Sequence, residues 1–121
     1  MDQNAPSDVY LDQLRRTRER FALSLSGRLD AITTQIETAR DGGMREAASR
    51  KLHRLFHDLA GNAAMLDLAS IEAAMRDGLH FSERADREGR DLTTQERTLV
   101  GEAIERTRRL ADVLVRDLPA I

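Results

Sequence analysis

Apolar residues recur along the first third of the chain at the three-, four- and seven-residue steps of an amphipathic helix. The series comprises Leu14, Phe21, Leu25, Leu29, Ile32 and Ile36. A start signal at 6–8 (Pro-Ser-Asp) and a stop signal at 41–43 (Asp-Gly-Gly) predict a helix over residues 8–40. At 1.5 Å per residue its length would be about 50 Å, which is long for a small bundle. The sequence therefore predicts a break or a kink within the polar run 15–20, with the first segment capping the bundle as an extra helix.

Two more amphipathic series follow the double glycine. The second helix carries one apolar stripe and ends at about residues 66–68. This stripe comprises Ala48, Leu52, Leu55, Leu59 and Leu66. The third helix begins near Ser70 and fades into the charged stretch 83–90, where Gly89 marks a turn. Its shared face comprises Ile71, Met75, Gly78 and Leu79.

The fourth helix opens with Thr93 and Glu96, which have the spacing of a capping box. In that motif the two residues satisfy two otherwise unpaired amide donors reciprocally. Pro119 ends the helix. Its apolar stripe comprises Val100, Ile104, Thr107, Ala111, Leu114 and Leu118.

Four amphipathic helices joined by short loops predict an all-α, up-down-up-down antiparallel four-helix bundle. The 121 residues fit one domain, residues 1–121, with its core at about 20–118. Only 3% of the residues are aromatic, so the composition offers little material for a sheet. The core is predicted to contain Leu25, Leu29, Ile32, Leu52, Leu55, Leu59, Met75, Ile104, Ala111 and Leu114.

Composition excludes several classes of function. The chain has no Cys, which rules out disulfides, thiol nucleophiles, zinc fingers and iron–sulfur sites. Its 19 basic and 21 acidic residues leave a net charge of −2, and the run 15–20 contains Glu19 and no aromatics, so no nucleic-acid partner is expected. No signal peptide and no apolar window of membrane-spanning length is found, so we expect a cytoplasmic protein without a membrane partner.

His57 lies almost opposite the centre of its helix's apolar stripe and is predicted to face solvent. Most single surface histidines are inert, so the neighbours decide the interpretation. Those within two turns are Arg50, His53, Arg54, Ala60, Gly61 and Ala64. A mid-helix glycine costs about 1 kcal/mol relative to alanine, so Gly61 reflects close helix packing, a tolerated defect, or room for another protein's backbone. Arg54, with Arg50 one turn further back, could meet an anion on the ring.

The segment 57–66, His-Asp-Leu-Ala-Gly-Asn-Ala-Ala-Met-Leu, resembles the motif of histidine-containing phosphotransfer (HPt) domains. In that family a Lys follows the His by three residues and a Gly by four. Through the helix pattern the resemblance covers about residues 21–118. It departs at Ala60, where the family usually has the Lys whose charge flanks the phosphoryl group, and at Asp67, where a Gly often closes the helix. Arg54 is a candidate to replace that charge.

The resemblance implies a phosphorelay intermediate of two-component signal transduction. His57 would accept a phosphoryl group from the aspartyl phosphate of a response-regulator receiver domain and pass it to another receiver. Arg54, Ala60 and Gly61 would lie beside the phosphoryl group, and the receiver would dock on the six neighbours of His57 listed above. Receiver domains and a hybrid histidine kinase are the expected partners of a monomer. Mg²⁺ would belong to the receiver only, and no ATP-binding or kinase motif is present in the chain.

Three other interpretations stay open. His53 and His57, four residues apart, could chelate a metal completed by Asp58 or His80, although the pair is predicted to point outward. In the phosphoacceptor helix pair of a sensor kinase, Asp58 would be the carboxylate that follows the His, but the expected Pro is missing and that pair must dimerise. A non-catalytic interaction module would have an inactive His57. Asp58 is otherwise a solvated residue beside Asn62, and His80 a partly buried packing residue.

Overall fold

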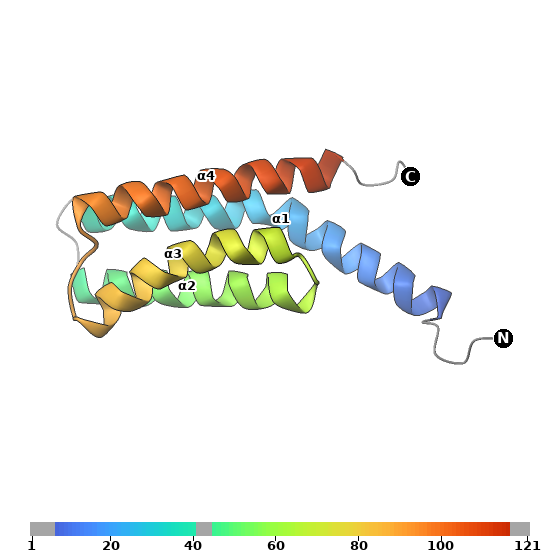
Figure 1. Ribbon diagram of the computed structural model, residues 1–121, viewed down its shortest axis with the longest axis horizontal. Helices are drawn as coiled ribbons and strands as arrows, with labels where there is room; N and C mark the ends of the chain where they lie inside the picture. Colours follow the sequence, from blue (N-terminus) through green and yellow to red (C-terminus); the bar gives the residue numbers. More distant parts are fainter. Residues whose placement is uncertain (1–6, 41–44, 117–121) are drawn as a thin grey trace.

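The computed structural model describes residues 7–40 and 45–116, and within them it contains four helices and no strand. The helices are α1 (Asp8–Arg40), α2 (Arg45–Met65), α3 (Ala69–Arg87) and α4 (Thr94–Arg116). They lie side by side, and each packs against two others, in the cycle α1, α2, α3, α4 (Figure 1). The predicted helical class and the number of helices are confirmed. The stop signal 41–43, Pro6, Leu118 and Pro119, and the side chain of Ala48, lie outside the described residues.

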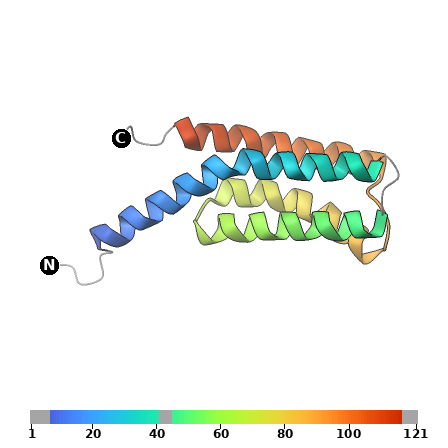
Figure 2. The ribbon, with the colours of Figure 1, turned by 180° about the vertical axis from the view of Figure 1, so that it is seen from behind.

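α1 is one continuous helix of 33 residues, so a break and a separate capping helix are wrong. The helix axis does change direction where its N-terminal part leaves the bundle, as the predicted kink would require (Figures 1 and 2). The run 15–20 contains no Gly or Pro to interrupt a helix, and Asp12 pairs with Arg15 and Arg16 at 2.6 and 3.0 Å. Figures 1 and 2 show that the N-terminal part projects past the end of the bundle. Arg18 lies where this part of α1 leaves the bundle. Its Nε donates a 2.7 Å hydrogen bond to the carbonyl oxygen of Leu66 at the end of α2.

The core is continuous through all four helices. Every predicted core residue is buried except Leu55 and Leu114, which are partly buried and pack against the core. Phe56, which the predicted stripe omits, is fully buried. Its ring lies over Gly78 of α3, where an added Cβ would be only 2.5 Å from a ring atom. The buried face of α2 is therefore rotated from the predicted stripe toward Phe56, and this contact explains the glycine at 78.

α2 and α3 end in the same hydrogen-bonded turn, although only one of them ends in glycine. At the end of α2, the Leu68 and Asp67 amides donate to the carbonyl groups of Ala63 and Ala64 at 2.9 and 3.1 Å. This is the Schellman arrangement, and Asp67 takes the left-handed position with φ 61°. Gly89 has φ 64° in the corresponding position after α3, which confirms the predicted turn.

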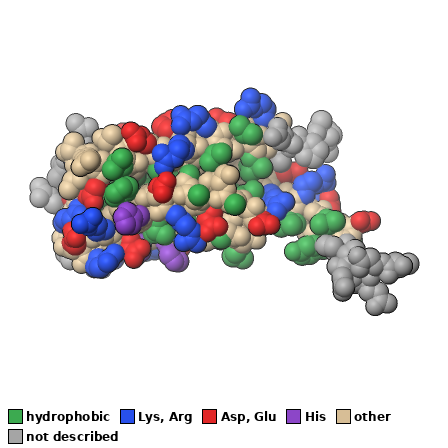
Figure 3. Space-filling model, in the orientation of Figure 1, with side chains coloured by type: hydrophobic (Ala, Val, Ile, Leu, Met, Phe, Trp, Pro, Cys, Tyr) green, Lys and Arg blue, Asp and Glu red, His purple; other side chains and the backbone are tan. Residues whose placement is uncertain are grey.

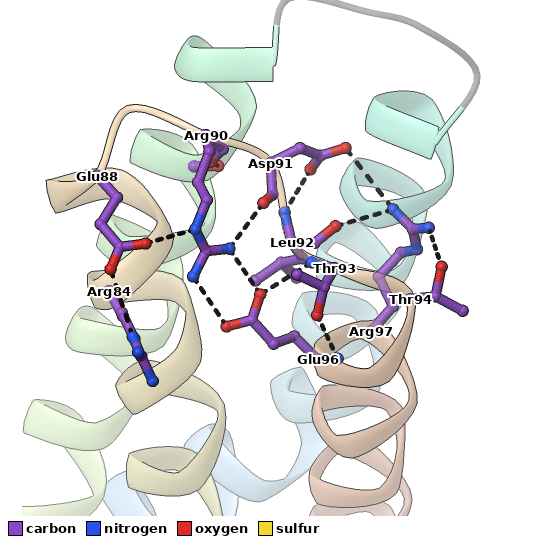
Figure 4. Close-up of polar contacts among 10 residues, drawn as sticks. Arg84, Glu88, Arg90, Asp91, Leu92, Thr93, Thr94, Glu96 and Arg97 are labelled. Carbon is purple, nitrogen blue, oxygen red and sulfur yellow. Dashed lines mark hydrogen bonds and ion pairs between the residues drawn. The ribbon is translucent and has the colours of Figure 1, made fainter.

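The connection between α3 and α4 is a network of charged hydrogen bonds (Figure 4). The Thr93 amide donates to Glu96 at 2.8 Å and the Glu96 amide donates to the Thr93 hydroxyl at 3.1 Å, which confirms the capping box. Arg90 donates to both carboxylate oxygens of Glu96, at 2.7 and 3.2 Å. The hydrogen bond from Arg90, with help from Thr93, lowers the pKa of Glu96 to about 2. The Ser49 hydroxyl donates to the Arg90 carbonyl group and so ties α2 to this loop.

Candidate functional site

His57 projects into solvent from the middle of α2, as predicted. Its side chain is 71% exposed, and neither ring nitrogen is hydrogen-bonded within the described residues. The nearest carboxylate is that of Asp58, whose Oδ1 is 3.9 Å from Nδ1, beyond hydrogen-bonding distance. Asp58 is itself exposed, and the expected pairing with Asn62 is not observed. The imidazole is thus an accessible nucleophile or proton acceptor on a rigid helix.

The outward direction of His57 follows from the residue before it. Phe56 is fully buried against α3, and successive side chains on a helix diverge by about 100°. Gly61, one turn beyond His57, is exposed, and a Cβ added there would meet nothing within 4 Å. Close helix packing is therefore excluded as the reason for this glycine, at least within the described residues. The two remaining interpretations, a tolerated defect and room for a partner beside His57, are both consistent with the geometry.

His53 is held by a carboxylate from α3 that the sequence analysis missed. Its Nδ1 is 2.9 Å from Oδ2 of Asp86, and the two side chains are 32% and 20% exposed. Arg50 approaches the other carboxylate oxygen at 3.9 Å. The His53 and His57 rings are edge to face, with centroids 6.4 Å apart. With Nδ1 donating to Asp86, the Nε2 of His53 is the ring nitrogen left for a second interaction.

Ala60 does not belong to the exposed surface, contrary to the prediction that it lies beside the phosphoryl group and under a docked receiver. It is only 2% exposed and is part of the core. The reason is the rotation of α2, since Ala60 lies one turn from Phe56 on the same face. The remaining predicted residues are at least partly exposed. We call them the His57 face, and they are Arg50, His53, Arg54, His57, Gly61 and Ala64.

Arg54 is the one arginine of the His57 face without an ion pair or hydrogen bond to the described residues. It is exposed and lies one turn before His57, where the sequence analysis placed positive charge. A guanidinium without a protein partner can turn toward an incoming anion without first breaking an ion pair.

His80 lies on α3 and is exposed, which corrects the expectation that it is a partly buried packing residue. Its ring contacts Phe81 edge to face, with centroids 5.3 Å apart. Across residues 7–40 and 45–116, no three His, Asp or Glu side chains gather as a metal site would require.

Comparisons with protein-family models, with curated proteins and with solved structures gave no match for this chain. None of the described helices is long and apolar enough to cross a membrane. Function is therefore inferred from the chemistry of the His57 face.

Proposed function

We propose that this chain is an HPt-like phosphotransfer protein, with the up-down-up-down topology of that family. His57 accepts a phosphoryl group from a receiver-domain aspartyl phosphate and passes it to a second receiver. One observation carries the proposal: an exposed imidazole without a hydrogen-bonding partner stands one turn from a glycine with open space around it.

In the transfer step this chain has only to hold the imidazole of His57 in position for attack on the phosphorus. The lone pair on Nε2 of neutral His57 attacks the phosphorus, and the proton on Nδ1 stays on the ring. As the N–P bond forms, the bond from phosphorus to the aspartyl oxygen breaks, and its electrons leave with the receiver's carboxylate. The step requires the proton on Nδ1, the ring nitrogen that faces Asp58 at 3.9 Å, so that Nε2 is free to attack. Mg²⁺ belongs to the receiver, and no cofactor of this chain is required.

In this chain the positive charge near the phosphoryl group comes from positions other than the lysine of the HPt motif. Ala60 is buried, so the usual lysine position provides no charge here. We assign that role to Arg54 and to His53, whose ring is fixed by Asp86 at 2.9 Å. When His53 is protonated it gains a proton on Nε2 and becomes a cationic donor 6.4 Å, ring to ring, from His57.

The test is phosphoryl transfer from a panel of radiolabelled, phosphorylated receiver domains to this protein. We expect acid-labile, base-stable label on the wild-type chain and none on His57→Gln. His80→Gln is the matched control, since His80 is also exposed but lies on α3, and it should be labelled like wild type. His57→Gln should change the free energy of unfolding by no more than about 0.5 kcal/mol, because the replaced side chain is exposed.

Two results would overturn the proposal. If no receiver labels the wild-type protein, the chain is better described as a non-catalytic interaction module. If His57→Gln is labelled and His53→Gln is not, the acceptor is His53.

A further inference from the structure

The N-terminal part of α1 continues the core stripe beyond the helices that cover it. We call residues 8–17 the overhang. Within it Tyr10 and Leu11 are 56% and 48% exposed, and Leu14 is partly buried. At 100° per residue these three lie on the same stripe as the buried Phe21 and Leu25. Figure 3 shows hydrophobic side chains on this projecting segment, outside the body of the bundle. An apolar stripe prolonged in this way is typical of a helix that packs against a partner helix.

The charges of the overhang are arranged to suit a second copy of itself. Asp8 lies at its tip without an ion pair to the described residues. Arg15 and Arg16 lie toward the bundle, where both pair with Asp12 of the same helix at 2.6 and 3.0 Å. If two overhangs lie antiparallel, the acidic part of each faces the basic part of the other. Asp8 and Arg15 are seven residues apart and so flank the stripe on the same side, which brings Asp8 of one copy near Arg15 of the other.

An apolar groove lies at the end of the bundle from which the overhang leaves. It is formed by the turn between α2 and α3, residues 67–71, and by Leu110, Val113 and Leu114 of α4. Val113 is 46% exposed. Figure 1 shows this turn at the same end as the start of α1. Because overhang and groove share one end, a two-fold axis can place each tip near the partner's groove and close the assembly at two copies.

We propose that two copies of this chain form a dimer through antiparallel contact of their overhangs, covering Tyr10, Leu11 and Leu14. The overhang is already ordered for this contact, since it is helical and Arg18 fixes its exit from the bundle through Leu66. The inference does not depend on phosphotransfer, and it replaces the monomer expected from the family resemblance.

The test is the molar mass of the full-length chain in solution, by light scattering and sedimentation over a range of concentrations. We expect a dimer, and we expect Leu11→Glu to weaken it about tenfold or more, because a charge would be buried in the contact. Val9→Glu is the matched control, since Val9 is 68% exposed and lies on the opposite side of the overhang. It should leave the dimer unchanged. Asp8→Arg should weaken the dimer, and adding Arg15→Asp should restore it.

A wild-type chain that stays monomeric at the highest concentration would overturn the inference. So would a dimer equally sensitive to Val9→Glu and Leu11→Glu, or one that Leu11→Glu does not affect. Circular dichroism of each variant checks that the fold is kept, which is expected because both side chains are largely exposed in one copy. Labelling of His57 by a receiver is a separate measurement, so either proposal can fail without the other.

Discussion

Two glycines within neighbouring helices have opposite surroundings. A Cβ at Gly78 would lie 2.5 Å from the ring of Phe56, closer than real Cβ atoms approach, whereas a Cβ at Gly61 would meet nothing within 4 Å. Each glycine costs about 1 kcal/mol of helix stability relative to alanine. The packing of Phe56 accounts for the first. For Gly61 the described structure offers no packing reason, and we propose that this glycine leaves room for a partner protein.

The two faces of α2 differ in the same way, since one is packed against the core and the other is open to solvent. Phe56 holds the helix against α3, while His57, the next residue, is exposed and makes no hydrogen bond within the described structure. Stability and function are thus assigned to adjacent residues on opposite faces, and substitutions on the two faces should have different consequences.

The largest loss of stability is expected from Gly78→Ala. The new methyl group must displace a fully buried ring, and overpacking of this kind costs about 1–3 kcal/mol. The higher helix propensity of alanine offsets part of this overpacking cost, so the free energy of unfolding should fall by about 1–2 kcal/mol. Chemical denaturation measures it. In a Phe56→Leu background, which removes the ring, the same substitution should cost less. An equal cost in both backgrounds would show that the ring is not the obstacle.

Acid should weaken the bundle through the α3–α4 loop. The hydrogen bond from Arg90 holds the pKa of Glu96 at about 2 in the folded protein, below the unfolded value of 4.5. The stability this provides is present above the unfolded pKa and is lost as pH falls from about 4.5 to about 2. Glu96→Gln should therefore cost about 1–2 kcal/mol at neutral pH, and the difference from wild type should vanish near pH 2. A pH-independent difference would contradict the role of this carboxylate.

The smallest effect, with the opposite sign, is expected for Gly61→Ala. Nothing obstructs the added methyl group, so alanine should raise the free energy of unfolding by up to about 1 kcal/mol. The measurement is again chemical denaturation, beside Gly78→Ala. Destabilisation by both substitutions would mean that Gly61 is also a packing glycine and would remove the contrast between the two sites.

The positions of the four helices were predictable because they follow from periodic signals. Stripes of leucine and isoleucine located all four helices, and the spacing of Thr93 and Glu96 identified a cap that the structure contains. The rotation of α2 was not predictable from its stripe, since Phe56 reaches the core through the absence of a side chain at Gly78, on another helix. The break in α1 was predicted from its length, but the run 15–20 has no Gly or Pro and the helix continues through it.

The exposure of His57 was predicted from the same periodicity, but its surroundings were not. Asp86 contacts His53 across 33 residues of sequence, and its place in a run of mixed charges made it look like any solvated residue. Ala60 was misplaced because the family motif suggested a surface position, while the burial of Phe56 one turn earlier carries it into the core.

The most direct test of the account is the rate of phosphoryl transfer from a cognate phosphorylated receiver to Gly61→Gln. A long side chain there should obstruct docking without harming the fold, and a misplacement of about 1 Å can slow transfer about a hundredfold. Gly101→Gln is the matched control, because that glycine is also open and lies on α4, which does not pack against α2. We predict transfer slowed about a hundredfold in Gly61→Gln, at an unchanged or higher melting temperature, and near the wild-type rate in Gly101→Gln. A stable Gly61→Gln protein that accepts phosphoryl groups at the wild-type rate would contradict the claim that the partner docks beside His57.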